Sequence, residues 1–221
     1  MESKCDTPYN FNSVHFVMSA PSISDLPEDT GAEIAFIGRS NAGKSSCLNA
    51  LCSRKTLAKT SRTPGRTRLI NLFELEPGKR FVDLPGYGYA KVSKQEKATW
   101  DRSLEEYLQK RESLKGLVLL MDIRNPLKEG DRQMIDWSLA AGIPLQILLT
   151  KADKLPRGQR KKAVDETAAA LREFGPGDMR LFAFSAVDQS IGMDAFKLNL
   201  TAWFDNTPAG EGNDGREETE E

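Results

Sequence analysis

Short apolar runs alternate with amphipathic helical patterns over residues 30–204, and this order predicts an α/β fold built on a largely buried, mostly parallel sheet. The runs Leu69–Leu75 and Arg80–Val82 flank the turn Glu76-Pro77-Gly78 and predict a hairpin. We therefore expect a three-layer fold with helices on both faces of the sheet and one antiparallel edge strand. The other predicted strands are Glu33–Ile37, Gly116–Ile123, Pro144–Leu149 and Arg180–Phe184.

Helical periodicity is clearest over Ser93–Ser113, which opens on a capping box from Ser93 to Glu96. An apolar stripe along this segment should dock on the sheet; it consists of Trp100, Leu104, Tyr107 and Leu108. An earlier helix should hold Leu48 and Leu51, and later ones are expected at Gly130–Ala141, Pro156–Phe174 and Met193–Phe204.

Charge and composition divide the chain into three parts. Residues 207–221 contain six acids, one arginine and no large apolar side chain, so we expect a disordered acidic tail. Residues 14–206 should form a single domain, and residues 1–13 a flexible N-terminal extension. Without the tail, the net charge of -1 becomes +4, so the folded part is mildly basic.

Several classes of protein are excluded by what the sequence lacks. The longest apolar run, Leu117–Met121, is far below the roughly 18 residues of a membrane span, and the N-terminus shows no secretory signal. Three cysteines and one histidine favour neither a disulfide framework nor a zinc site. We expect a monomeric cytoplasmic protein that does not contact membranes.

The segment Gly38–Ser45 matches the phosphate-binding loop pattern G-x-x-x-x-G-K-[ST] between a predicted strand and a predicted helix. Its glycines let successive backbone N–H groups point at an anion, the helix N-terminus adds partial positive charge, and Lys44 adds a full charge. Ser45 would place a hydroxyl on Mg²⁺. The loop therefore predicts a polyphosphate site.

A second element, Thr150–Asp153, follows a predicted strand at the edge where open α/β sheets bind ligands. The carboxylate of Asp153 can accept hydrogen bonds from both the ring N–H and the amino group of guanine, which selects GTP over ATP. Lys151 would lay its stem along the base. Backbone N–H groups of Phe184-Ser185-Ala186, after the next strand, could meet the guanine carbonyl.

A third element, Asp83-Leu84-Pro85-Gly86, also ends a strand and suits a carboxylate that holds Mg²⁺ through water, with a glycine N–H on the terminal phosphate. The stretch Gly86–Gly88 could order with GTP and relax after hydrolysis. Three threonines upstream could each complete the coordination of Mg²⁺, and spacing alone leaves the choice open: Thr60, Thr63 and Thr67.

These motifs together resemble the EngB (YihA/YsxC) family of bacterial ribosome-assembly GTPases, within the translation-factor class and its P-loop GTPase fold. The resemblance rests on GRSNAGKSS at 38–46, TSRTPGRTRLINLFEL at 60–75, DLPGYGYA at 83–90 and TKAD at 150–153. It implies GTP hydrolysis linked to maturation of the large ribosomal subunit, with ribosomal RNA in that subunit or its precursor as partner, and a need for the protein in cell division and septation.

The resemblance also implies residue roles. Ser45 and Thr67 are expected on Mg²⁺, and the catalytic set is Lys44, Thr67, Gly86 and Asn41. The residues expected to contact nucleotide and its ion are Gly38, Arg39, Ser40, Asn41, Ala42, Gly43, Lys44, Ser45, Ser46, Gly65, Arg66, Thr67, Arg68, Leu69, Asp83, Leu84, Pro85, Gly86, Thr150, Lys151, Ala152, Asp153, Phe184, Ser185 and Ala186.

Two residues depart from the broader GTPase pattern. Thr150 replaces an asparagine whose amide commonly braces the phosphate loop, so a modest guanine affinity is expected. Tyr87 stands where many GTPases carry a glutamine that orients water, so intrinsic hydrolysis should be slow. Asn41 resembles the asparagine of potassium-dependent relatives, and we hypothesise that it helps hold K⁺ near the transferring phosphate.

Two basic clusters are candidates for RNA contact. Residues 54–68 hold six cations and no acid, and a second cluster crowds the start of a predicted helix, where the dipole disfavours positive charge: Arg157, Arg160, Lys161 and Lys162. Two other functions stay open. A small-molecule phosphotransferase could use the same loop but leaves Asp153 unexplained, and a signalling or division switch would act through a protein partner without RNA.

Overall fold

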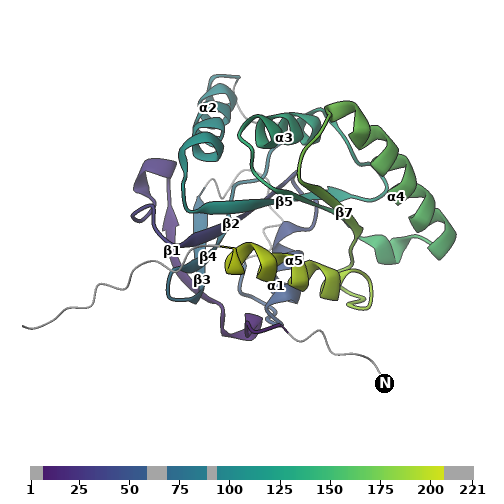
Figure 1. Ribbon diagram of the computed structural model, residues 1–221, viewed down its shortest axis with the longest axis horizontal. Helices are drawn as coiled ribbons and strands as arrows, with labels where there is room; N and C mark the ends of the chain where they lie inside the picture. The colour runs from purple at the N-terminus through teal and green to yellow at the C-terminus, as the bar shows by residue number, and fades with distance from the viewer. Residues whose placement is uncertain (1–6, 59–68, 89–93, 207–221) are drawn as a thin grey trace, which may run out of the picture.

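The computed structural model describes residues 7–58, 69–88 and 94–206. Its centre is a seven-stranded sheet in the order β1-β3-β4-β2-β5-β6-β7 (Figure 1). The strands are β1 (His15–Ala20), β2 (Ala32–Gly38), β3 (Ile70–Glu76), β4 (Lys79–Asp83), β5 (Leu114–Asp122), β6 (Leu145–Thr150) and β7 (Met179–Ala183). Every strand that the apolar runs predict is present, and the predicted fold class is confirmed.

One strand runs against the others. β3 pairs antiparallel with β4 through the expected hairpin, and it also pairs antiparallel with β1. β1 was not predicted, and it occupies the edge of the sheet outside β3. Its side chains do not alternate between buried and exposed, and the pairing shifts by one residue between Phe16 and Met18, so the sequence lacks the period of two that marks a strand.

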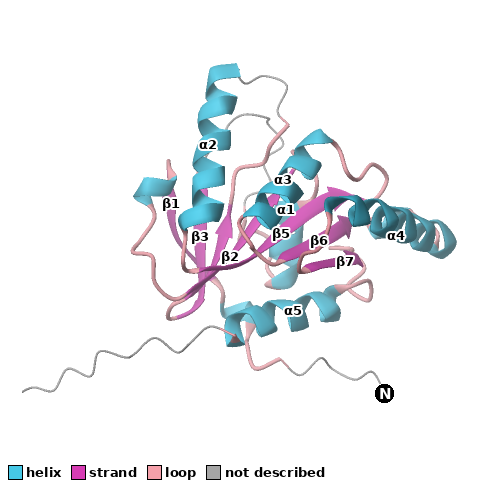
Figure 2. Cartoon of the chain, turned by 45° about the horizontal axis from the view of Figure 1, so that its top comes forward, coloured by secondary structure: helices cyan, strands magenta, loops and turns pink. Residues whose placement is uncertain are grey.

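Helices cover both faces of the sheet, as Figure 2 shows. α1 (Lys44–Leu51) and α5 (Met193–Asp205) pack on one face, where the core includes Phe36, Phe81 and Phe196. On the other face lie α2 (Lys94–Lys110), α3 (Glu129–Ala140) and α4 (Arg157–Leu171). Short 3-10 helices complete the fold: η1 (Phe11–Ser13), η2 (Ile23–Asp25), η3 (Ala152–Lys154) and η4 (Arg172–Phe174).

The amphipathic stripe of α2 packs as its spacing predicts. Leu104, Tyr107 and Leu108 are buried against the sheet, and Trp100 is half-buried beside them. The expected capping box at the start of this helix involves Ser93, which lies outside the described residues. α3, α4 and α5 begin and end within a few residues of their predicted limits.

Residues 7–13, which the sequence placed in an N-terminal extension, contact the domain. Tyr9 and Phe11 are buried in the core cluster on the α1 and α5 face. The Tyr9 hydroxyl donates to Asp205 Oδ1 at 2.5 Å, near the end of α5, and the Phe11 ring stacks on Phe81. This stretch therefore closes one end of the core.

The parallel strands bring three loops to one edge of the sheet. β2, β4 and β6 all end there, and their last residues lead into the phosphate loop, the Asp83–Gly86 segment and Thr150–Asp153. Among residues 7–58, 69–88 and 94–206, no helix combines the length and apolar content that a membrane span requires.

Candidate nucleotide-binding site

The phosphate loop connects β2 to α1 and contains two residues with positive φ. Asn41 has φ of 64° and Gly43 has φ of 94°, so the chain reverses between Gly38 and Lys44 and begins α1 there. Gly38 has no room for a side chain, because a Cβ atom there would lie 2.7 Å from the backbone oxygen of Leu120. The backbone thus adopts the strand–loop–helix form that the motif predicts.

Lys44 and Asp83 form an ion pair across the mouth of this loop. Both side chains are largely withdrawn from solvent, with 15% and 9% of their surfaces exposed. The amide of Asn71, on β3, lies 3.5 Å from the second oxygen of Asp83. A cation expected on phosphate and a carboxylate expected near Mg²⁺ therefore neutralise each other.

The chain after Asp83 runs along the phosphate loop. Leu84 donates its backbone N–H to Phe36 O at 3.0 Å, and Tyr87 forms an isolated parallel bridge with Arg39. In that bridge, Tyr87 N donates to Gly38 O at 3.3 Å and Ser40 N donates to Tyr87 O at 3.1 Å. These bonds bring Gly86 beside the loop, in the region where its N–H could meet a terminal phosphate.

Thr150 braces the phosphate loop with its side chain. Its Oγ1 lies 2.6 Å from Ala42 O and 3.0 Å from Met121 O, and Thr150 is buried. The hydroxyl of Thr150 therefore braces the loop in place of the absent amide, and the modest guanine affinity expected from the loss of that amide stays a prediction. A Cβ atom on Gly43 would touch the Thr150 side chain at 3.7 Å, so the two elements are in close contact.

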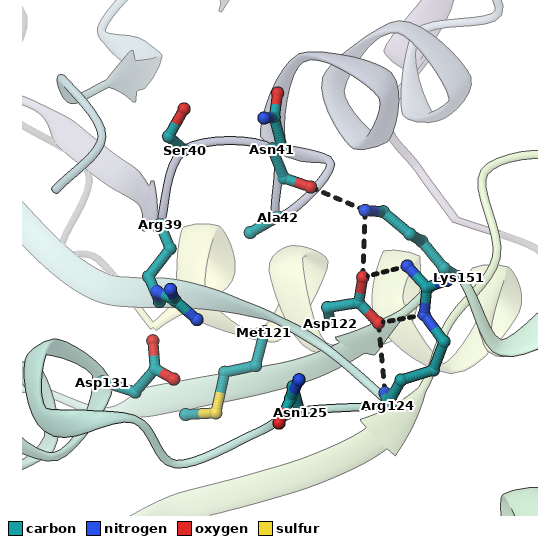
Figure 3. A pocket seen from close by; sticks show the side chains of 10 residues that line it. All are labelled: Arg39, Ser40, Asn41, Ala42, Met121, Asp122, Arg124, Asn125, Asp131 and Lys151. Carbon is teal, nitrogen blue, oxygen red and sulfur yellow. Dashed lines mark hydrogen bonds and ion pairs between the residues drawn. The ribbon is translucent and has the colours of Figure 1, made fainter. Parts of the chain in front are cut away.

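A pocket of about 390 Å³ opens between the phosphate loop and the end of β5 (Figure 3). Lys151 lies on one side of it, donating to Asn41 O at 2.7 Å and pairing with Asp122 at 3.0 Å. Asp122 also pairs with Arg124 at 2.6 Å. The Arg124 guanidinium, followed by Lys151, holds the pKa of Asp122 well below its usual range, so this carboxylate stays ionised.

Asp153 and Ser185 meet at the far end of the site. Ser185 Oγ donates to Asp153 Oδ1 at 2.8 Å, and Lys154 pairs with Asp153 Oδ2 at 3.0 Å. These contacts, the hydroxyl first, lower the pKa of Asp153. Each carboxylate oxygen has two lone pairs, so Asp153 can still accept two hydrogen bonds from a ligand.

Ser185 also fixes the loop that follows it. Its Oγ accepts backbone hydrogen bonds from Val187 N at 3.1 Å and Asp188 N at 2.9 Å. Phe184 is buried. Its backbone carbonyl accepts a hydrogen bond from Ala152 N at 3.1 Å and so joins this loop to the Thr150–Asp153 element. The sequence anticipated only backbone groups from Phe184, Ser185 and Ala186, and the hydroxyl of Ser185 was not predicted.

The described part of the predicted site thus gathers at one edge of the sheet. The predicted residues Gly65, Arg66, Thr67 and Arg68 lie outside the described residues, whereas Leu69 is described and exposed. Sequence reasoning missed Asp122, Arg124 and Asp131, all of which line the pocket. Asp122 could have been found, because it ends the strand β5, and it pairs in register with Thr150.

Three features at one edge of the sheet define a P-loop GTPase. They are the strand–loop–helix at Gly38–Lys44, the pair of Lys44 with Asp83, and the Thr150–Asp153 element. The sequence pattern of the family described as "50S ribosome-binding GTPase" matches residues 33–151. The chain is 60% identical over 195 residues to "Probable GTP-binding protein EngB" of Aeromonas hydrophila, covering 88% of this chain and 89% of that one. The chain belongs to the EngB family of GTP-binding proteins.

A second relative and two solved structures are similar to the chain. The EngB protein of Escherichia coli O1:K1 is 53% identical and aligns with 97% of this chain and all of its own length. A crystal structure of a probable GTP-binding protein EngB aligns with a TM-score of 0.59 at 19% identity, over 80% of this chain and 100% of that one. Era of Aquifex aeolicus bound to GDP and AlF4- aligns with a TM-score of 0.61 at 20% identity, covering 82% of this chain and 58% of that one. At these identities the two structures establish the fold.

Proposed function

We propose that this protein hydrolyses GTP slowly, with Mg²⁺. It acts in the cytoplasm as a monomeric switch in the assembly of the large ribosomal subunit. Normal cell division and septation depend on the protein. One observation carries the guanine assignment. Asp153, fixed by Ser185, lies at the same edge of the sheet as Lys44, and Thr150 joins the two elements through Ala42 O. One molecule with a guanine ring and a polyphosphate would satisfy both ends.

The proposed roles follow from the placement of each group. Lys44 and the loop N–H groups bind the phosphates, while Lys151 lies along the base that Asp153 recognises. Ser45, in the first turn of α1, and Thr67 supply oxygen ligands for Mg²⁺, with Asp83 acting through water. The carboxylate and hydroxyl donors fit a hard cation, and Mg²⁺ would neutralise charge between the outer phosphates.

Slow hydrolysis is supported by the direction of the Tyr87 side chain. Its hydroxyl donates to Asp131 Oδ1 at 2.6 Å, so it does not orient an attacking water. We assign no side chain as general base. Asn41, exposed at the tip of the loop, is proposed to help hold K⁺ near the transferring phosphate. Turnover should be faster in K⁺ than in Na⁺, and equal rates would reject this role.

The proposed ribosomal partner is supported by the family description and by the basic surface. Arg54, Lys55 and Arg157 are exposed. The second basic cluster is weaker support than its sequence indicates, because Lys161 pairs with Asp165 at 2.6 Å and Lys162 with Glu166 at 3.7 Å within α4. Binding to ribosomal RNA should weaken steeply as salt rises, whereas a shallow salt dependence favours a protein surface as partner.

Two experiments test the proposal. Calorimetry should detect GDP and GTP binding and no ATP binding; equal uptake of ATP would overturn the guanine assignment. Depleting the protein and profiling ribosomal particles on a sucrose gradient should reveal accumulated precursors of the large subunit. A normal profile, with co-purifying division proteins that ribonuclease does not release, would favour the signalling alternative. Turnover that requires an added acceptor would favour a phosphotransferase.

A further inference from the structure

Tyr87 is joined to two different parts of the site. Its backbone forms the bridge with Arg39 on the phosphate loop, and its hydroxyl donates to Asp131 in the first turn of α3. Asp131 is fully buried, and its other carboxylate oxygen accepts from Lys128 N at 2.8 Å at the start of the helix. Asp131 is therefore held in place by α3 independently of Tyr87.

The packing around the ring confirms that the contact is tight. A Cβ atom on Gly130 would lie 2.7 Å and 2.9 Å from two atoms of the Tyr87 ring, so any larger side chain would displace it. Burial, followed by the charge of Asp131, raises the pKa of Tyr87, which keeps its hydroxyl a hydrogen-bond donor at neutral pH. Figure 3 shows Asp131 on the pocket wall, facing the guanidinium of Arg39.

Gly86 immediately precedes this anchored residue. Its backbone N–H is the group proposed to meet the terminal phosphate, which GTP has and GDP lacks. The position of that N–H depends on where Tyr87 is held, because one peptide unit separates the two residues. Tyr87 is thus held by the phosphate loop through its backbone and by Asp131, 44 residues away in sequence, through its hydroxyl, and both contacts act on the neighbouring Gly86.

We propose that Asp131 is a positioning residue, which holds Tyr87 against α3 and thereby sets Gly86 N–H for the terminal phosphate of GTP. The inference rests on the proposed function, since it concerns how GTP is distinguished from GDP at the same site. Tyr87 acts here as an anchor for the backbone, and Asp131 acts through Tyr87 without touching the nucleotide.

The test compares affinities for GDP and for a non-hydrolysable GTP analogue, with GTP turnover as a second readout. Tyr87→Phe removes only the hydroxyl, and Asp131→Asn keeps the size of the side chain. Each should weaken binding of the analogue about fivefold, leave GDP affinity unchanged and lower kcat more than it changes KM. The double variant should be no worse than either single variant, because both changes remove the same bond.

Gly130→Ala separates positioning from stability. Alanine favours a helix more than glycine, so a structural effect on α3 alone would leave the analogue-to-GDP ratio unchanged and raise the thermal midpoint. Displacement of the Tyr87 ring should lower the ratio instead. The matched control is Tyr107→Phe, which removes a hydroxyl that donates to the buried carboxylate of Glu33 at 3.3 Å near the opposite end of the sheet. It should leave the ratio unchanged.

The outcomes are distinguishable. If Tyr87→Phe, Asp131→Asn and Gly130→Ala all keep the wild-type ratio of affinities for the analogue and for GDP, the positioning role is overturned while the proposed function stands. Additive losses in the double variant would also overturn it. If the wild-type protein neither distinguishes the analogue from GDP nor hydrolyses GTP, the proposed function itself fails.

Discussion

The base-recognition end and the phosphate end of the site are organised in opposite ways. At the base end, Asp153 is oriented by Ser185 and Lys154 and still has free acceptor positions. At the phosphate end, Lys44 is paired with Asp83, two groups that would each contact the nucleotide or its ion. Asp153 therefore keeps open acceptor positions for a guanine ring, whereas at the phosphate end Lys44 already has a negatively charged partner with which a phosphate group would compete.

This difference assigns separate tasks to the two ends. In the proposed function, the preorganised carboxylate of Asp153 contributes affinity and specificity for guanine in any nucleotide state. At the phosphate end, a change in the Lys44–Asp83 pair on binding would act on the chain that leads to Gly86, because Asp83 ends β4. The phosphate end is thus where GTP and GDP can produce different structures.

The largest expected effect comes from changing the preorganised end. Asp153→Asn replaces a charged acceptor by an amide that cannot accept from both guanine N–H groups, so GTP affinity should fall roughly 30-fold. Xanthosine triphosphate, which presents a carbonyl in place of the amino group of guanine, should bind to Asp153→Asn more tightly than it binds to the wild-type protein. Calorimetry with both nucleotides measures this. Asp165→Asn, on the exposed face of α4, is the matched control. Equal GTP affinity in the two variants would contradict the assignment.

Breaking the ion pair tests the phosphate end. Asp83→Asn releases Lys44, so GDP affinity measured with a chelator present should rise about fivefold. With Mg²⁺ present, GTP turnover should fall, because the outer support of the ion is lost. The control Asp136→Asn removes an exposed carboxylate from α3. If Asp83→Asn instead lowers GDP affinity in the presence of the chelator, the Lys44–Asp83 pair stabilises the binding-competent loop and does not compete with phosphate.

The link between the two ends should have a smaller effect. Thr150→Val keeps the shape of the side chain but leaves Ala42 O without the hydroxyl donor at 2.6 Å, so nucleotide affinity should fall about threefold. Thr167→Val removes a buried hydroxyl that donates to Ala163 O at 2.7 Å within α4, and it serves as the control for lost stability. Unchanged affinity in Thr150→Val, with the same thermal midpoint, would show that the brace is dispensable.

The smallest effect is an expected absence of pH dependence. The pKa of Asp153 is lowered from its ordinary value, so the carboxylate remains ionised from about pH 8 down to about pH 5. The ratio of GDP affinities between the wild-type protein and Asp153→Asn should therefore stay constant over that range. A ratio that declines with a midpoint inside the range would show that Asp153 is protonated there and is not the charged acceptor proposed.

The parts of the site that local sequence encodes were predictable. The phosphate loop is one continuous segment whose glycines and lysine define its conformation, and the apolar runs give its strand and helix. Contacts between distant segments were not predictable from the sequence. The hydrogen bond from Tyr87 to Asp131, for example, joins residues whose proximity depends on how α3 packs. The brace formed by Thr150 was not predicted either, because the reach of its hydroxyl to Ala42 O depends on how closely the end of β6 approaches the loop.

The ion pair between Lys44 and Asp83 gives the lysine a negatively charged partner within the chain itself. A departing nucleotide leaves behind a lysine and a carboxylate that can recombine at once, so no uncompensated charge is stranded in a poorly hydrated place.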